Sequence, residues 1–107
     1  MKKTPLPSRI LRAMKAHPPF HQAVWRACAG IPKGQVRTYG WIAREIGRPG
    51  AARAVGQALG KNPFAPHVPC HRVVGADGRL TGFSGPGGVK AKRRLLLRDG
   101  APIRKLP

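Results

Sequence analysis

Apolar residues recur at helical spacing along much of this chain, and glycine or proline separates each such stretch from the next. Phe20, Val24 and then either Ala27 or Cys28 follow one another at intervals of about one helical turn, which predicts a helix that opens at a pair of prolines and stops at Gly30. Ala27 fits the same face as Cys28. On this pattern we expect Cys28 to be a core residue rather than a reactive one.

Two shorter helices are predicted at residues 39–46 and 51–59. Thr38 is placed to cap the first helix, Gly47 ends it, and Gly60 ends the second. The connection between them is tight and contains glycine. A helix, a short glycine-bearing turn and a second helix form the order of a helix-turn-helix, which on its own is a weak signal.

The remaining pattern predicts a β-hairpin at residues 73–81, with Asp77-Gly78 as its turn, and a last helix at 89–98. We therefore expect a mainly α fold with a small β-hairpin, built as a winged-helix-like helix-turn-helix domain.

The first 17 residues are basic and contain proline, with a short helix predicted at 8–16. We expect residues 1–17 to be a loose or peripherally docked arm, which either adds contacts to phosphate or only increases solubility. Residues 18–107 are expected to form one small domain.

The net charge of the chain indicates what kind of partner it binds. The chain has 21 Lys and Arg against 3 Asp and Glu, a formal charge of +18. Such a charge favours nucleic acid first and an anionic membrane second.

Helix 51–59 is slim, because only Arg53, Gln57 and Leu59 are bulky. Its Ala/Gly face is suited either to close approach in the minor groove of DNA or to tight packing on a neighbouring helix.

Several classes of protein are disfavoured. No apolar run approaches the ~20 residues of a membrane-spanning helix, and the basic N-terminus lacks the apolar segment of a secretory signal. We therefore expect a cytoplasmic, nucleoid-associated protein, in which Cys28 and Cys70 stay reduced. Zinc is not expected, because the chain has no Cys-x-x-Cys spacing and an adjacent Cys and His rarely hold one ion.

The strongest candidate for chemistry is Cys70, which His71 follows directly. A free thiol has a pKa near ~8.5, so it needs a base or a positive field to act as a nucleophile at neutral pH. Prolines at 63, 66 and 69 are expected to hold the preceding segment stiff and extended. A rigid mount of this kind is what a positioned nucleophile requires.

A series of spaced motifs resembles the alkylguanine-DNA alkyltransferases, the methylated-DNA–protein-cysteine methyltransferases. The resemblance covers roughly residues 20–100. It rests on Ile31-Pro32-x-Gly34, Thr38-Tyr39, Ala51-Ala52-Arg53-Ala54-Val55-Gly56, Asn62-Pro63, Pro69-Cys70-His71-Arg72-Val73 and Gly87-Gly88-Val89-x-x-Lys92-x-x-Leu95-Leu96.

The resemblance implies a single-turnover repair protein that rotates O6-alkylguanine out of duplex DNA and transfers the alkyl group irreversibly to Cys70. It implies that His71 takes the thiol proton through a water and that Asp99 orients His71. Tyr39 would help to rotate the 3′ phosphate and would donate a proton toward the leaving guanine. No cofactor or metal is implied, because the protein is itself the acceptor.

The resemblance also implies the DNA-binding and pocket residues. Arg53 would fill the gap left by the flipped base, and Asn62 would brace the turn beneath the site. Ser84 would line the base pocket, with Lys92 close to it. The full DNA-binding set that we expect is Thr38, Ala52, Arg53, Gly56 and Gln57, and the pocket or supporting set is Asn62, Val68, Pro69, Phe83, Ser84 and Lys92.

The chain departs from the family pattern at several points. Asp99 stands where the family usually has Glu, so its bond to His71 is expected to be longer or water-bridged. Phe83 stands where Tyr is common, and Gly85-Pro86 resembles an insertion. From the sequence we expect no counterpart of the family's separate N-terminal domain, a brevity that resembles the alkyltransferase-like proteins, which bind alkylated DNA without repairing it. Those proteins replace the cysteine that this chain keeps.

Three functions therefore stand open. The first is an active alkyltransferase, acting as a monomer on double-stranded DNA that carries O6-alkylguanine. The second is a non-enzymatic sensor of alkylated DNA that recruits nucleotide excision repair. The third is a general DNA-binding module, whose affinity would fall steeply with salt and ignore the lesion.

Overall fold

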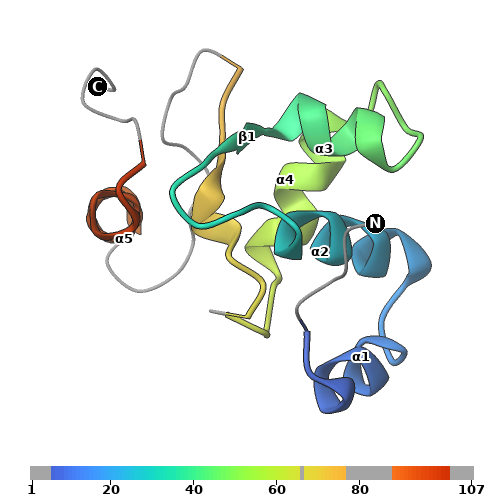
Figure 1. Ribbon diagram of the computed structural model, residues 1–107. Helices are drawn as coiled ribbons and strands as arrows, with labels where there is room; N and C mark the ends of the chain where they lie inside the picture. Colours follow the sequence, from blue (N-terminus) through green and yellow to red (C-terminus); the bar gives the residue numbers. More distant parts are fainter. Residues whose placement is uncertain (1–5, 66, 77–87, 102–107) are drawn as a thin grey trace.

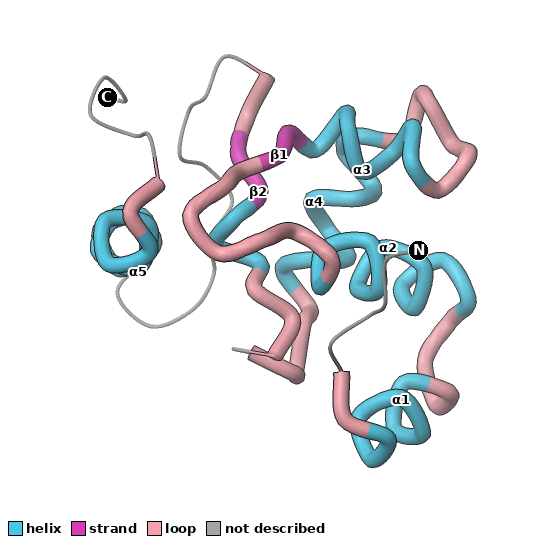
Figure 2. The backbone as a smooth tube through the Cα atoms, in the orientation of Figure 1, coloured by secondary structure: helices cyan, strands magenta, loops and turns pink. Residues whose placement is uncertain are grey.

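The computed structural model describes residues 6–65, 67–76 and 88–101. In this part of the chain, helices dominate and two very short strands form the sheet (Figures 1 and 2). The elements are α1 (Ser8–Met14), α2 (Pro19–Ala29), β1 (Arg37–Thr38), α3 (Tyr39–Glu45), α4 (Ala52–Gly60), the 3-10 turn η1 (Cys70–Arg72), β2 (Val73–Val74) and α5 (Gly88–Asp99).

Helix α2 forms the centre of the main core. It begins with a proline in its first turn, where the missing N–H costs no hydrogen bond. Val24, Trp25 and Cys28 on its inner face are fully buried, as the apolar spacing predicts. The indole Nε1 of Trp25 donates a 2.9 Å hydrogen bond to the carbonyl of Ala58. This bond fastens α2 to α4 and satisfies the only polar atom of the indole.

Helices α3 and α4 form the predicted helix-turn-helix. The hydroxyl oxygen of Thr38 accepts a 2.9 Å hydrogen bond from the backbone N–H of Trp41, so Thr38 caps α3 as expected. Gly47 follows α3 with a φ of +77°, a conformation that glycine adopts without strain. Helix α4 buries Val55 and Ala58 and leaves its opposite face exposed.

Helix α1 is docked on the main core rather than loose. Leu6, Ile10 and Met14 recur at intervals of one turn and belong to the same buried cluster as Trp25. Met14 is fully buried. The physical reason is that Leu6, Ile10 and Met14 give the short helix one continuous apolar face, while its charged residues lie on the other side.

The two strands pair in parallel, with Arg37 opposite Val73 and Thr38 opposite Val74. The partner of β2 in the described residues is therefore β1, which comes from the segment just before the helix-turn-helix. The predicted hairpin turn at Asp77-Gly78 lies outside the described residues. This pairing holds the η1 turn close to the beginning of α3.

Helix α5 packs against η1 and lies away from α1 (Figure 1), and its Lys92 reaches Tyr39 at the start of α3. Its Leu96 packs with Val74 and Ala101 in a second, smaller core, which Val36 partly covers. In the part of the chain that the structure describes, none of the helices is long and apolar enough to span a bilayer.

Candidate active site and nucleic-acid interface

Cys70 opens the η1 turn, directly after the buried residues Val68 and Pro69. Cys70 itself is partly exposed, whereas the side chain of His71 next to it is only 9% exposed. The segment before the turn is braced by Asn62. Its side-chain Nδ2 donates a 2.8 Å hydrogen bond to the carbonyl of Val68, and its Oδ1 accepts one of 2.8 Å from the backbone N–H of Phe64. The thiol therefore stands on a rigid support.

His71 contacts Asp99 directly. The imidazole Nε2 of His71 lies 2.9 Å from Oδ2 of Asp99. The sequence-based expectation of a longer or water-bridged contact is therefore wrong. The reason is that α5 extends to Asp99, so the end of the helix lies against η1 and the shorter side chain needs no greater reach.

The same carboxylate oxygen also holds Arg72. The guanidinium Nε of Arg72 donates a 3.0 Å hydrogen bond to Oδ2 of Asp99, and another of its nitrogens donates a 2.9 Å bond to the carbonyl of Ile31. A side chain built on Gly34 would meet the backbone oxygen of Asp99 at 3.1 Å, and Gly34 has a φ of +88°. Glycine at this turn thus permits the approach of the α5 end that completes the network.

The electrostatic surroundings of His71 and Asp99 favour a neutral imidazole beside an ionised carboxylate. Burial is the main cause that lowers the pKa of His71, while the hydrogen bond and charge of Asp99 oppose this shift. Burial alone would raise the pKa of Asp99, but hydrogen bonds from His71 and Arg72 hold it below its usual value. An ionised carboxylate only accepts hydrogen bonds, so Nε2 of neutral His71 carries the proton and Nδ1 keeps its lone pair.

A buried lysine lies within electrostatic reach of both cysteines. Lys92 is 1% exposed, and burial lowers its pKa to about 8 against the opposing charges of Cys70 and Cys28. Its Nζ donates a 3.4 Å hydrogen bond to the hydroxyl of Tyr39 and lies 5.6 Å from the centre of that ring. Both cysteines are free thiols, and burial raises the pKa of Cys28, which is fully buried.

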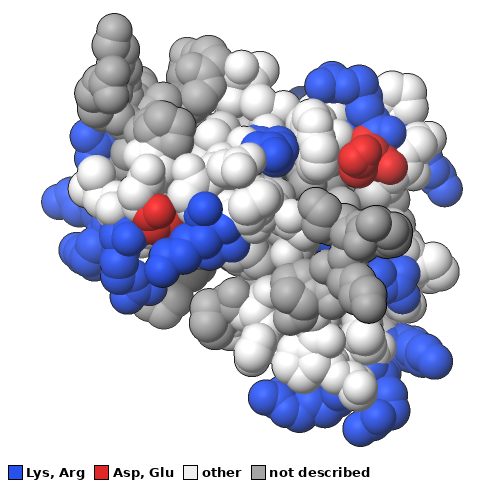
Figure 3. Space-filling model, in the orientation of Figure 1, with Lys and Arg blue, Asp and Glu red and all other residues white. Residues whose placement is uncertain are grey.

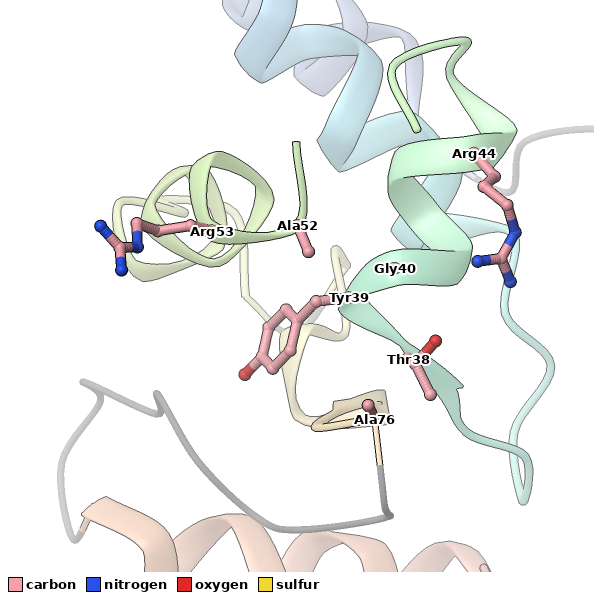
Figure 4. A pocket seen from close by; sticks show the side chains of 7 residues that line it. All are labelled: Thr38, Tyr39, Gly40, Arg44, Ala52, Arg53 and Ala76. Atoms are coloured by element: carbon pink, nitrogen blue, oxygen red, sulfur yellow. The ribbon is translucent and has the colours of Figure 1, made fainter. Parts of the chain in front are cut away.

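An open cavity of ≈ 630 Å³ lies between the first turns of α3 and α4 (Figure 4). Tyr39 points into the space between the two helices, and Arg53 extends away from α4. A side chain at Gly56 would meet the ring of Tyr39 at 3.8 Å, so the slim face of α4 packs against the tyrosine. The full lining is Thr38, Tyr39, Gly40, Arg44, Ala52, Arg53 and Ala76.

The structure therefore brings four of the expected residues together around this cavity: Thr38, Tyr39, Ala52 and Arg53. Gln57 is exposed on the next turn of α4. Cys70 is not among the lining residues of this cavity. Phe83 and Ser84, which the resemblance assigns to the base pocket, lie outside the described residues.

Basic side chains are spread over one face of the molecule. Figure 3 shows Lys and Arg over α5, around α1 and on the side of α3, with acidic atoms in few places on this face. Within the described residues, no group of three or more His, Cys, Asp or Glu is arranged to hold a metal ion.

Sequence reasoning missed two side chains that the structure places at the site. Arg72 bonds to Asp99, and its position next to His71 in the Pro-Cys-His-Arg motif was the available signal. Arg44 lines the cavity, and nothing in the local pattern distinguishes it from the other exposed arginines of this chain.

Comparisons with known proteins identify the family of the chain. Residues 19–101 match the family described as 6-O-methylguanine DNA methyltransferase, DNA binding domain. The chain is 60% identical over 77 residues to the methylated-DNA–protein-cysteine methyltransferase of Mycobacterium tuberculosis, which covers 72% of this chain and 46% of that protein. The chain thus spans about half the length of the curated relatives it matches.

Solved structures give the same assignment. The crystal structure of Mycobacterium tuberculosis OGT in complex with DNA matches with a TM-score of 0.74 and 54% identity, over 81% of this chain and 53% of that one. S. pombe Atl1, in complex with damaged DNA containing O6-carboxymethylguanine, matches with a TM-score of 0.68 and 38% identity, over 76% and 75% of the two chains. With the matched region reaching from α2 to the end of α5, the chain belongs to the 6-O-methylguanine DNA methyltransferase family through its DNA-binding domain.

Proposed function

We propose that this protein repairs DNA by direct reversal, with Cys70 as the acceptor of the alkyl group of O6-alkylguanine. The observation that carries the proposal is the contact between His71 and Asp99 at 2.9 Å, one residue after a partly exposed thiol. The family supports it, because the relative from Mycobacterium tuberculosis that is 60% identical over 77 residues is a methylated-DNA–protein-cysteine methyltransferase.

In this proposal the thiol proton of Cys70 passes through a water to Nδ1 of His71. Asp99 accepts from Nε2 and stabilises the imidazolium that forms. The thiolate attacks the alkyl carbon, an S–C bond forms and the bond between that carbon and O6 breaks. The electron pair of the broken bond stays with guanine, which takes up a proton and is restored.

Tyr39 is the proposed donor of that proton. The ammonium of Lys92 donates a hydrogen bond to the hydroxyl of Tyr39, which makes the phenol a better acid and stabilises a phenolate. An alkyl carbon inside a duplex is out of reach of a thiolate, so the base must leave the stack at a cost of a few kcal/mol. Arg53 would fill the gap and offset part of that cost.

The test is the mass of the intact protein after incubation with duplex DNA that carries O6-methylguanine. The expected result is the gain of one methyl group on Cys70. Cys70→Ala should gain none, and Cys28→Ala should still gain one, because the Cys28 thiol is fully buried. An unchanged mass of the wild-type protein would exclude the transfer reaction.

A second function is favoured by one observation: the S. pombe Atl1 match spans three quarters of both chains and concerns a protein bound to damaged DNA. In this alternative the chain binds alkylated DNA without transfer and hands the lesion to excision repair. It requires that wild type and Cys70→Ala prefer lesion-bearing over plain duplex equally, and that neither gains mass.

A further inference from the structure

The cavity between α3 and α4 carries a cation that has no role in the proposed transfer. Arg44 lines it together with Thr38 and Gly40, on the side of α3. In Figure 4 the guanidinium groups of Arg44 and Arg53 lie at opposite sides of the view, with Tyr39 between them. The cavity therefore has a positive charge on each flank.

The position of the Arg44 guanidinium is set by its own helix. A Cβ atom built at Gly40 would lie 3.7 Å from a terminal nitrogen of Arg44, so the guanidinium folds back along the first turn of α3. The same Cβ atom would lie 3.9 Å from the hydroxyl oxygen of Thr38. The fork of Arg44 and the hydroxyl of Thr38 are thus neighbours beside the cavity.

The guanidinium of Arg44 and the hydroxyl of Thr38 can both donate further hydrogen bonds. No carboxylate or hydrogen-bond acceptor in the described part of the chain pairs with the guanidinium of Arg44. The oxygen of Thr38 already accepts from Trp41 as the helix cap, which leaves its hydroxyl proton to donate. A cationic fork beside a free hydroxyl proton selects an anion with several acceptor oxygens, such as a phosphodiester.

We propose that Arg44 and Thr38 hold a backbone phosphate of DNA on the flank of the cavity opposite Arg53. This assignment rests on the proposed function, because it assumes that the DNA strand with the flipped nucleotide runs past Tyr39. Arg53 and Arg44 then fix that strand on both sides of Tyr39. The contact reads no base, so it positions DNA of any sequence.

The test measures the affinity of the full chain for a duplex, with and without O6-methylguanine, across a series of salt concentrations. Arg44→Gln is compared with wild type, with Arg44→Lys and with Arg12→Gln. Arg12→Gln removes the same charge from an exposed position that does not line the cavity, on helix α1, which lies away from α3 in Figure 1. Arg44 is also exposed, so its replacement should leave the thermal midpoint unchanged.

The expected result for Arg44→Gln is a loss of affinity of roughly tenfold on both duplexes, and a slope of log affinity against log salt that is shallower by about 1. Arg44→Lys should keep the slope and lose less affinity, since it keeps the charge without the fork. An unchanged slope in Arg44→Gln, or an equal change in Arg12→Gln, would overturn the proposal.

The mass assay keeps this outcome separate from the proposed function. At saturating DNA, Arg44→Gln should still gain one methyl group on Cys70. A wild-type protein that binds both duplexes through Arg44 but gains no mass would sustain the phosphate contact and exclude transfer. A wild-type protein that binds neither duplex would exclude both.

Discussion

Replacing Asp99 by Asn tests whether the carboxylate serves the proposed chemistry or only the fold. The substitution keeps the size of the side chain and removes the charge that His71 and Arg72 face at 2.9 and 3.0 Å. In the proposed transfer, His71 becomes positive as it takes the thiol proton. The carboxylate should therefore contribute more to the transition state than to the ground state.

The expected loss of transfer rate can be worked out from the hydrogen bond between His71 and Asp99. A hydrogen bond to a charged group contributes about 1.5–3 kcal/mol, and the side chain of Asp99 is only 6% exposed, so water screens it little. If that difference appears in the barrier, the transfer rate falls roughly tenfold to a hundredfold. The Asn side chain still accepts one hydrogen bond, which places the expected loss toward the lower end.

The pH dependence carries the second half of the prediction. Burial lowers the pKa of His71, and Asp99 acts to raise it, so loss of the charge lowers it further. A base whose pKa falls stays unprotonated to lower pH. The acid limb of the rate profile, which in wild type lies below the ordinary histidine value of about 6.5, should therefore move to lower pH in Asp99→Asn.

The assay is single-turnover methylation of Cys70 at saturating DNA, followed by mass spectrometry from acid to neutral pH. Asp99→Glu keeps the charge and should recover most of the rate. Glu45→Gln removes an exposed acid and should leave the profile in place. A plateau rate equal to wild type in Asp99→Asn, or an acid limb displaced to higher pH, would refute the reasoning.

Two further substitutions test the supports of the site. Asn62→Ala removes both hydrogen bonds that brace the segment before Cys70, and should lower the free energy of unfolding by about 1–3 kcal/mol in urea denaturation. An unchanged midpoint would mean that the turn is held by other contacts. Lys92 has a folded pKa of about 8 against 10.5 unfolded, so between these values the unfolded chain binds more protons at this group, and the contribution of Lys92 to stability should rise with pH by roughly 3 kcal/mol. The raised pKa of buried Cys28 acts in the opposite direction in wild type and variant alike, so the prediction is for their difference. The stability of wild type relative to Lys92→Met should rise over this range, and a constant difference would contradict the prediction.

The helices could be predicted from the sequence because their signals are local. The apolar spacing of α2, the cap at Thr38 and the glycine at 47 each act within one or two turns, and the observed ends of α2, α3 and α4 lie close to the predicted ones. The sequence left open whether α1 is loose or docked, although Ile10 and Met14 repeat at helical spacing, because its many charges obscured a narrow apolar face.

The rest of the site depends on contacts between distant segments. Arg72 bonds to a carbonyl 41 residues earlier in the chain, and no local pattern specifies that partner. The parallel pairing of β1 with β2 is equally non-local. The distance between His71 and Asp99 was misjudged because side-chain length was considered alone, whereas the position of the α5 end, which Gly34 permits, determines the reach.

The two separate cores have a consequence for how the molecule opens. The helix-turn-helix belongs to the large cluster around Trp25, whereas α5 is held by the small cluster around Leu96, by the Asp99 contacts and by the hydrogen bond from Lys92 to Tyr39. Local opening needs only the smaller set of contacts to break. Amide protons of α5 should therefore exchange with solvent sooner than those of α2. The exchange would pass through a partly open form in which α3 and α4 stay folded but His71 no longer contacts Asp99.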